Sequence, residues 1–246
     1  MGALRFQLAA SLSLGLVPVA LAQGRRLRRT AHRLPEAPGE RLGAADGSEP
    51  ALRIAAVGES PLAGVGLADQ ADALTPCLAQ LIAGSTGRAV RWQTAARGGA
   101  TAGAVQRSLV GRLAPEPVDL FIIGLGVNDS IALRGLRRWQ RDLAALINAL
   151  YKQCGPAPVL LAGVPDMHHF PVLPAPLRHM LGSRARLLDH GAAALAATNP
   201  DITHVPMQLD GQMQALFCSD GFHPNADGHA LWAAQLLPAA LELIGH

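Results

Sequence analysis

The stretch DLFIIGLGVND, residues 119–129, combines a short apolar run with a turn that carries polar side chains. Its first half is continuously apolar, which is typical of a strand that is buried on both faces of a parallel sheet. Gly126, Asn128 and Asp129 follow at the carboxyl end of this strand, where open parallel sheets form their ligand sites. The stretch therefore predicts a buried strand whose end opens onto a polar site.

Short apolar runs alternate with helical patterns along the rest of the chain. We expect strands at residues 53–57, 89–94, 119–124, 158–163 and 202–205, and helices at residues 69–83, 101–113, 134–153, 177–198 and 226–244. Right-handed crossovers between parallel strands place helices on both faces of a sheet. The alternation thus predicts an α/β fold, a three-layer α/β/α sandwich with a five-stranded parallel sheet.

Composition divides the 246 residues into three parts. Residues 1–24 are mostly apolar and are predicted to be a hydrophobic signal or anchor segment. Residues 25–51 are first basic and then rich in proline and glycine, which predicts a linker. Residues 52–246 are expected to form the folded domain, which has the size of a single α/β unit.

The N-terminal part carries two conflicting signals about export. Ala20-Leu21-Ala22 resembles the residues before a signal cleavage site, whereas the arginines from Arg25 to Arg33 oppose translocation of the chain beyond them. A cleaved signal peptide, an uncleaved anchor with arginines at the lipid headgroups, and a surface-associated helix remain open. We expect a membrane-associated or exported protein with membrane contact through residues 3–33, and a cytoplasmic protein is the alternative.

Basic charge is concentrated at the N-terminus, which excludes a nucleic-acid partner for the domain. Residues 1–42 hold seven of the 21 basic residues and two of the 18 acidic ones, which leaves 14 basic and 16 acidic residues beyond them. Cys77, Cys154 and Cys218 match no disulfide framework or metal motif, so free thiols are expected, with one disulfide as the alternative. The histidines have no metal-ligand spacing, so we expect no metal and no cofactor.

Four blocks of polar or glycine residues stand where nucleophilic catalysis needs them. A serine hydroxyl such as that of Ser60 attacks only when a base takes its proton, and a histidine, here His223, is the side chain most often used for this task. Asp220, three residues before it, would fix the imidazole tautomer. Backbone N–H groups of Ser60 and Gly99 and the side-chain amide of Asn128 could donate to an oxyanion.

These blocks resemble the SGNH/GDSL hydrolase superfamily over residues 53–243. The family's marker residues correspond to Ser60, Gly99, Asn128 and His223, and its Asp three residues before the histidine corresponds to Asp220. The resemblance implies a flavodoxin-like fold and a GDSL-type esterase or lipase. It also implies that a carboxylic ester or thioester is hydrolysed through an acyl-enzyme at the serine.

The chain departs from the family pattern at two positions. Glu59 stands where the family usually has Asp before the serine, and Ala95 stands where many members have Asn. The first position is not expected to take part in the chemistry, and the second is expected to alter hydrogen bonding near the oxyanion site. Neither departure removes a catalytic atom.

The substrate is expected to be a small-molecule or lipid ester. Apolar lining is expected from the loop of residues 164–176, through Met167, Phe170, Val172 and Leu173. Two other functions remain open on the same site, an acyltransferase and a non-catalytic, membrane-tethered binding protein. The sequence cannot separate hydrolysis from transfer, because both reactions share the acylation step.

Overall fold

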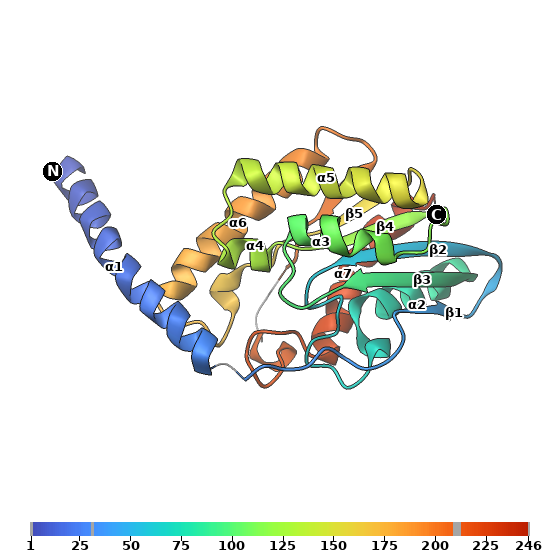
Figure 1. Ribbon diagram of the computed structural model, residues 1–246, viewed down its shortest axis with the longest axis horizontal. Coiled ribbons are helices and arrows are strands. Elements are labelled where there is room, and N and C mark those ends of the chain that lie inside the picture. Colours follow the sequence, from blue (N-terminus) through green and yellow to red (C-terminus); the bar gives the residue numbers. More distant parts are fainter. Residues whose placement is uncertain (1, 31, 209–212, 246) are drawn as a thin grey trace.

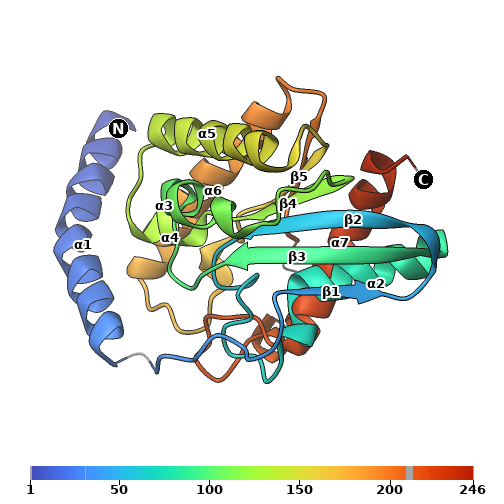
Figure 2. The ribbon, with the colours of Figure 1, turned by 45° about the vertical axis from the view of Figure 1, so that its right-hand side comes forward.

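A computed structural model describes residues 2–30, 32–208 and 213–245 of the chain. Its sheet has six strands in the order β1-β3-β2-β4-β5-β6 (Figures 1 and 2). The strands are β1 (Leu42–Ala45), β2 (Ser48–Gly58), β3 (Arg88–Ala96), β4 (Leu120–Gly124), β5 (Val159–Ala162) and β6 (Ile202–Val205). Strands β2 to β6 run parallel and confirm the predicted five-stranded sheet, and β1 adds an antiparallel edge strand.

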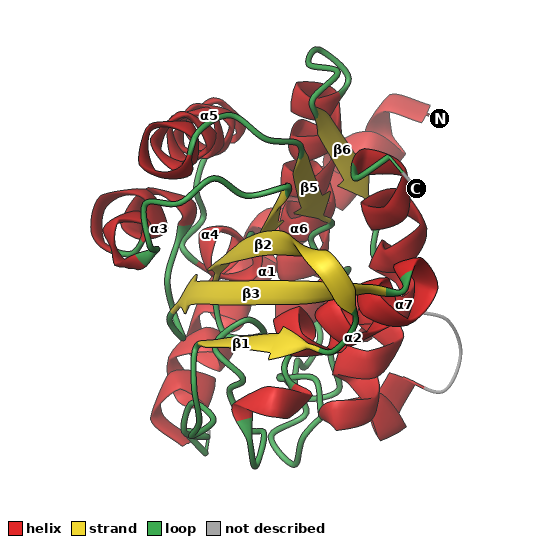
Figure 3. Cartoon of the chain, turned by 90° about the vertical axis from the view of Figure 1, so that its right-hand side faces the viewer, coloured by secondary structure: helices red, strands yellow, loops and turns green. Residues whose placement is uncertain are grey.

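Helices cover both faces of the sheet. They are α1 (Gly2–Thr30), α2 (Leu74–Thr86), α3 (Ala102–Ser108), α4 (Val127–Ile131), α5 (Leu136–Cys154), α6 (Leu177–Ala196) and α7 (Ala226–Leu243). Short 3-10 turns span Gln70–Asp72, Val110–Arg112, Met167–His169 and Met213–Leu216. Helices α3 and α5 lie on one side of the sheet, and α2 and α7 lie on the other (Figure 3).

Alternating side chains of the strands divide the core into two clusters. On β4, Phe121 and Ile123 pack with α3, α5 and α6, whereas Leu120 and Ile122 pack with α2 and α7. All five residues of β4 are buried, as the apolar run in the sequence predicts. Because both faces are covered, the polar groups of the site gather at the carboxyl ends of the strands.

The segment before the domain differs from the predicted linker. Residues 42–45 form β1, which pairs with β3, and β2 begins at Ser48 rather than at residue 53. Between α1 and β1 the chain also bonds to the domain, through Ala37 N–H to Gly64 O at 3.0 Å and Gly66 N–H to Pro35 O at 2.9 Å. Backbone pairing orders this stretch although it has no apolar periodicity, so the domain includes most of residues 35–51.

Helix α1 covers most of the predicted leader and continues through the arginines to Thr30 (Figure 1). Its last turns lie beside α6. Met1 of the predicted leader falls outside the described residues. No helix in the described part of the chain is both long enough and apolar enough to cross a membrane. The three cysteines are free thiols, as expected.

Candidate active site

Ser60 lies two residues beyond the end of the central strand β2. The preceding Glu59 N–H still donates to Gly124 O at 3.0 Å, so the neighbouring strand β4 holds the chain up to this point. The chain then turns sharply, with Val65 N–H donating to Ser60 O at 3.1 Å. Ser60 is 6% exposed and lines a pocket at the carboxyl edge of the sheet. The sheet thus fixes the position of its hydroxyl group.

Asp220 and His223 form a hydrogen-bonded pair within one short loop. His223 Nδ1 and Asp220 Oδ2 are 2.6 Å apart, and Asp220 Oδ1 accepts the backbone N–H groups of Phe222 at 2.9 Å and His223 at 3.0 Å. The loop is closed by Cys218 N–H, which donates to His223 O at 2.7 Å. This network holds the imidazole ring in one orientation.

The surroundings of Asp220 favour its ionised form. Burial acts to raise the pKa of Asp220, but hydrogen bonds from the His223 side chain and from two backbone N–H groups outweigh it, and the pKa lies below its ordinary value. An ionised Asp220 accepts the Nδ1 proton of His223, which leaves Nε2 as the nitrogen that can take a proton.

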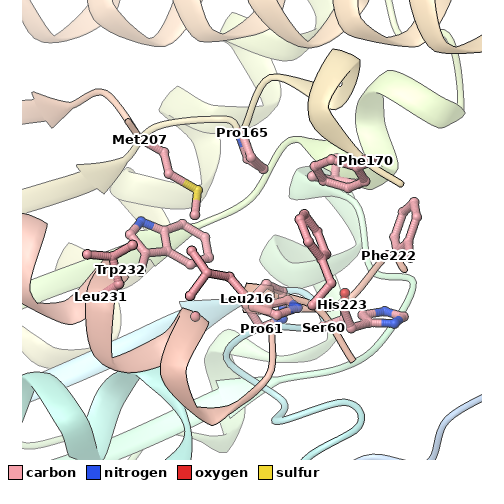
Figure 4. A pocket seen from close by; sticks show the side chains of 14 residues that line it. Ser60, Pro61, Pro165, Phe170, Met207, Leu216, Phe222, His223, Leu231 and Trp232 are labelled. Atoms are coloured by element: carbon pink, nitrogen blue, oxygen red, sulfur yellow. The ribbon is translucent and has the colours of Figure 1, made fainter. Parts of the chain in front are cut away.

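Ser60 and His223 meet at the same pocket. Figure 4 shows the two side chains next to each other at one end of it. Among the hydrogen bonds of the described residues, none joins the Ser60 hydroxyl to His223. Bonds of this kind often tighten only in the substrate complex, so the arrangement is compatible with a nucleophile and its base.

Gly99 lies in a turn in which Ala100 N–H donates to Arg97 O at 3.2 Å. Its φ of +78° is in the left-handed region, which a residue without Cβ adopts without strain. Glu36 Oε1 accepts the N–H of Gly98 at 2.7 Å and ties this turn to the segment before β1. No hydrogen bond between described residues uses the backbone N–H of Ser60 or of Gly99.

Asn128 lies in the first turn of α4, and its side chain contacts Glu59. Asn128 Nδ2 donates to Glu59 Oε2, which also accepts the Asn128 backbone N–H at 2.9 Å. Glu59 Oε1 accepts the N–H of Val127 at 2.8 Å. One proton of the Asn128 amide is thus engaged by Glu59, and the second is available to another acceptor.

Glu59 has a larger role than the sequence indicated. It is 2% exposed, and burial raises its pKa from the ordinary 4.5 to about 7, against the hydrogen bonds from Asn128 and Val127. Its carboxyl group is the contact between the end of β2 and the start of α4, and thereby between Ser60 and Asn128. Glu59 therefore positions a predicted site residue.

Asp129, the neighbour of Asn128, connects the start of α4 to the start of α3. Its Oδ2 accepts the N–H of Ala102 at 2.9 Å, at the start of α3 and just after the Gly99 turn. Burial raises its pKa. The structure thus links the second and third polar blocks through the buried carboxyl group of Asp129, whose role is structural.

The pocket beside Ser60 is lined almost wholly by apolar side chains. Those that accompany Ser60 and His223 include Pro61, Pro165, Phe170, Met207, Leu216, Phe217, Phe222, Leu231 and Trp232 (Figure 4). Most come from the loop before α7 and from α7 itself. Isolated apolar residues in an irregular loop carry no periodic signal, so the sequence did not single out Met207 or Leu216.

The loop of residues 164–176 does line the pocket, through Pro165 and Phe170, but three of the four lining residues predicted from it do not. Phe170 lines the pocket, but Met167 and Leu173 are buried in the core and Val172 packs against it. Phe170 packs edge-on against Phe222, with ring centroids 5.1 Å apart, and Val172 N–H donates to Gly221 O at 3.3 Å. The loop therefore mainly supports the loop that carries Asp220 and His223.

Known proteins resemble this chain in sequence and in fold. The sequence model of the GDSL-like Lipase/Acylhydrolase family matches residues 56–231. The chain is 31% identical over 195 residues to the GDSL-like esterase Rv1075c of Mycobacterium tuberculosis, a match that covers 75% of this chain but only 60% of that relative's length.

Two solved structures illustrate the likeness in fold. The crystal structure of TesA superposes with a TM-score of 0.62 at 26% identity and covers 78% of this chain and 99% of that one. A carbohydrate esterase family 3 protein from Talaromyces cellulolyticus gives a TM-score of 0.59 at 15% identity, covering 78% of this chain and 98% of that one. The second likeness concerns the fold alone.

Proposed function

Since the chain belongs to the GDSL-like Lipase/Acylhydrolase family, we propose that it hydrolyses carboxylic esters or thioesters through an acyl-enzyme at Ser60. The observation that carries this proposal is the Asp220–His223 pair, 2.6 Å apart, at the same pocket as the Ser60 hydroxyl group. A nucleophile, a base and a group that orients the base are the parts that acyl transfer to serine requires.

In the acylation step, His223 Nε2 takes the Ser60 hydroxyl proton while the Ser60 oxygen attacks the carbonyl carbon. The carbonyl oxygen becomes negative, and it is stabilised by the N–H groups of Ser60 and Gly99 and by the second amide proton of Asn128. The imidazolium then gives its proton to the departing alcohol or thiol. The same imidazole then takes a proton from water, which attacks the acyl-enzyme, and returns that proton to the Ser60 oxygen as the acid leaves.

The apolar pocket favours an acyl group of short to medium length over a polar acid. Met207, Leu231 and Trp232 lie at the far end of the pocket from His223 (Figure 4). An alkyl chain that extends from the Ser60 oxygen toward Trp232 would bury apolar surface, which stabilises binding by about 25 cal/mol per Å². A small-molecule or lipid ester with such a chain is therefore the proposed substrate.

A fluorophosphonate probe tests the proposed nucleophile directly. The full chain should be labelled covalently, and the Ser60→Ala variant should not be labelled. Ser108→Ala is a matched control, because among the described residues this exposed hydroxyl bonds to Ala104 O alone, within its own helix α3, at 2.8 Å. Labelling of Ser60→Ala, or no labelling of the wild type, would contradict the mechanism and favour a binding protein.

Nitrophenyl esters of increasing acyl length then test the proposed substrate. Turnover should rise from acetyl to medium chains and fall for long chains. Addition of an alcohol acceptor separates hydrolysis from acyl transfer. Formation of the new ester at the expense of free acid would identify the acyltransferase that shares the acylation step.

A further inference from the structure

The side chain of Gln23 makes two hydrogen bonds between helix α1 and the domain. Gln23 Nε2 donates to Ala175 O at 2.8 Å, and Gln23 Oε1 accepts the N–H of Leu177 at 3.1 Å. Leu177 is the first residue of α6, whose N-cap residue Pro176 provides no side-chain hydrogen bond. The first N–H groups of a helix need partners from outside it. Gln23 supplies one, so α1 completes the start of α6.

The same face of α1 makes the apolar contacts. Ala20 is 2% exposed within the core cluster, Leu27 packs against that cluster, and Gly24 faces Leu177 closely enough that an added Cβ would lie 3.9 Å from its Cδ1. Positions 20, 23, 24 and 27 form a single stripe on a helix. The spacing shows that α1 packs on α6 in a defined register.

Within residues 16–29, α1 exposes an apolar stretch and then a basic stretch. Leu16, Val17, Val19 and Leu21 are between 40% and 46% exposed. The four arginines that follow, Arg25, Arg26, Arg28 and Arg29, are also exposed, and the sequence of α1 contains no acidic residue to balance them. The exposed apolar side chains and the arginines therefore lie one after the other along the axis of α1, not on opposite faces of the helix.

We propose that α1 remains part of the folded protein and holds the domain obliquely on an anionic lipid surface. In this position Leu16, Val17, Val19 and Leu21 enter the acyl region, and the arginines lie at the headgroups. A partner that covers this part of α1 must be apolar beside residues 16–21 and negatively charged beside the arginines. An anionic lipid layer has both properties, in its acyl region and in its headgroups. Gln23 binds the end of the loop that carries Phe170, so the anchor is joined to a wall of the pocket.

Vesicle sedimentation with the purified full chain tests the lipid partner. The chain should sediment with vesicles that contain about one third phosphatidylglycerol and much less with pure phosphatidylcholine vesicles, and added salt should weaken the binding. The triple variant Leu16→Ser/Val19→Ser/Leu21→Ser should lose at least tenfold in vesicle affinity. Leu42→Ser, at a leucine of β1 that is 65% exposed, should bind as the wild type does.

A negative result would be recognisable. If vesicles do not bind the wild type, and the triple variant instead converts a dimer into a monomer in sedimentation velocity, then a second copy covers this surface and the proposal is wrong. Equal binding of the wild type and the triple variant would likewise overturn it. Neither measurement depends on esterase activity, so both are independent of the proposed function.

Retention of α1 is tested separately. The intact mass of the protein from its native host should include residues before Gln23, and a chain that starts at Gln23 would exclude the anchor. Trypsin should cut slowly between Arg25 and Arg29 in the wild type and at least tenfold faster in Gln23→Ala, in which α1 is unfastened. Equal cutting rates would contradict the docked helix. Gln153→Ala, which removes another side-chain-to-backbone bond, to Leu113 O at 2.8 Å, is the matched control.

Discussion

Replacement of Glu59 by glutamine should change how stability depends on pH. The buried carboxyl group has a pKa raised from 4.5 to about 7, mainly by burial. The folded protein therefore binds the Glu59 proton more tightly than the unfolded chain does. The stabilisation from this proton is fully present below pH 4.5 and is lost as the pH rises through about 7.

The size of the effect follows from the same difference. At about 1.4 kcal/mol per pH unit, the free energy of unfolding of the wild type should fall relative to Glu59→Gln by roughly 3 kcal/mol between about pH 4.5 and pH 8. The variant has no titrating group at this position, so it lacks this term. In Glu59→Gln the single side-chain oxygen can accept the Asn128 N–H but not the Val127 N–H as well. The unpaired Val127 N–H should lower the free energy of unfolding of the variant by about 1–3 kcal/mol at every pH.

Urea unfolding at a series of pH values measures both quantities. The difference in free energy of unfolding between wild type and Glu59→Gln should change with pH, with a midpoint between 4.5 and about 7. Glu116→Gln is the control, because this carboxylate is 61% exposed and pairs with Arg53 at the surface. Parallel stability profiles for the wild type and Glu59→Gln would refute the buried, proton-binding carboxyl group.

Four further substitutions test the site. Asn128→Ala should lower kcat by about 10²–10³-fold. Glu59→Ala should lower kcat much less in the Asn128→Ala background than in the wild type. Additive losses of kcat in this double-mutant cycle would contradict the positioning of Asn128 by Glu59. Asp220→Asn should lower kcat by about 10⁴-fold because His223 would lose its fixed tautomer, and a loss below tenfold in nitrophenyl ester turnover would remove Asp220 from the mechanism. Trp232→Ala should lower the free energy of unfolding by about 3–5 kcal/mol, as measured in urea, and should reduce turnover of medium-chain esters more than that of acetyl esters; an unchanged chain-length profile would exclude this wall as the acyl site.

The parallel sheet could be predicted because β2, β4 and β5 each contain a buried apolar run. In β4, five consecutive residues are buried, and a run of this kind has few alternatives to a central strand. The antiparallel edge strand β1 could not be predicted, because only Ala45 of its four residues, LGAA, is buried and the strand is held by backbone bonds to β3. Backbone pairing leaves no trace in side-chain periodicity.

The site residues could be located because their blocks stand at strand ends, and parallel strands end at one edge of the sheet. The contacts of their neighbours could not be predicted. Glu59 was recognisable only as a departure from a pattern, since its contact with Asn128 joins residues 69 positions apart. The pocket wall at Met207 and Trp232 likewise depends on how a loop and a helix pack.

The edge position of β1 decides where the chain can be shortened. A chain that begins at Leu52, the domain start predicted from composition, would lose β1 and leave the backbone groups of β3 unpaired along its outer side. An uncovered strand edge of this length invites pairing with another molecule. The same cut would remove Glu36 and with it the bond that holds Gly98. Residues 35–51 thus protect the sheet against self-association while they brace the turn that contains Gly99.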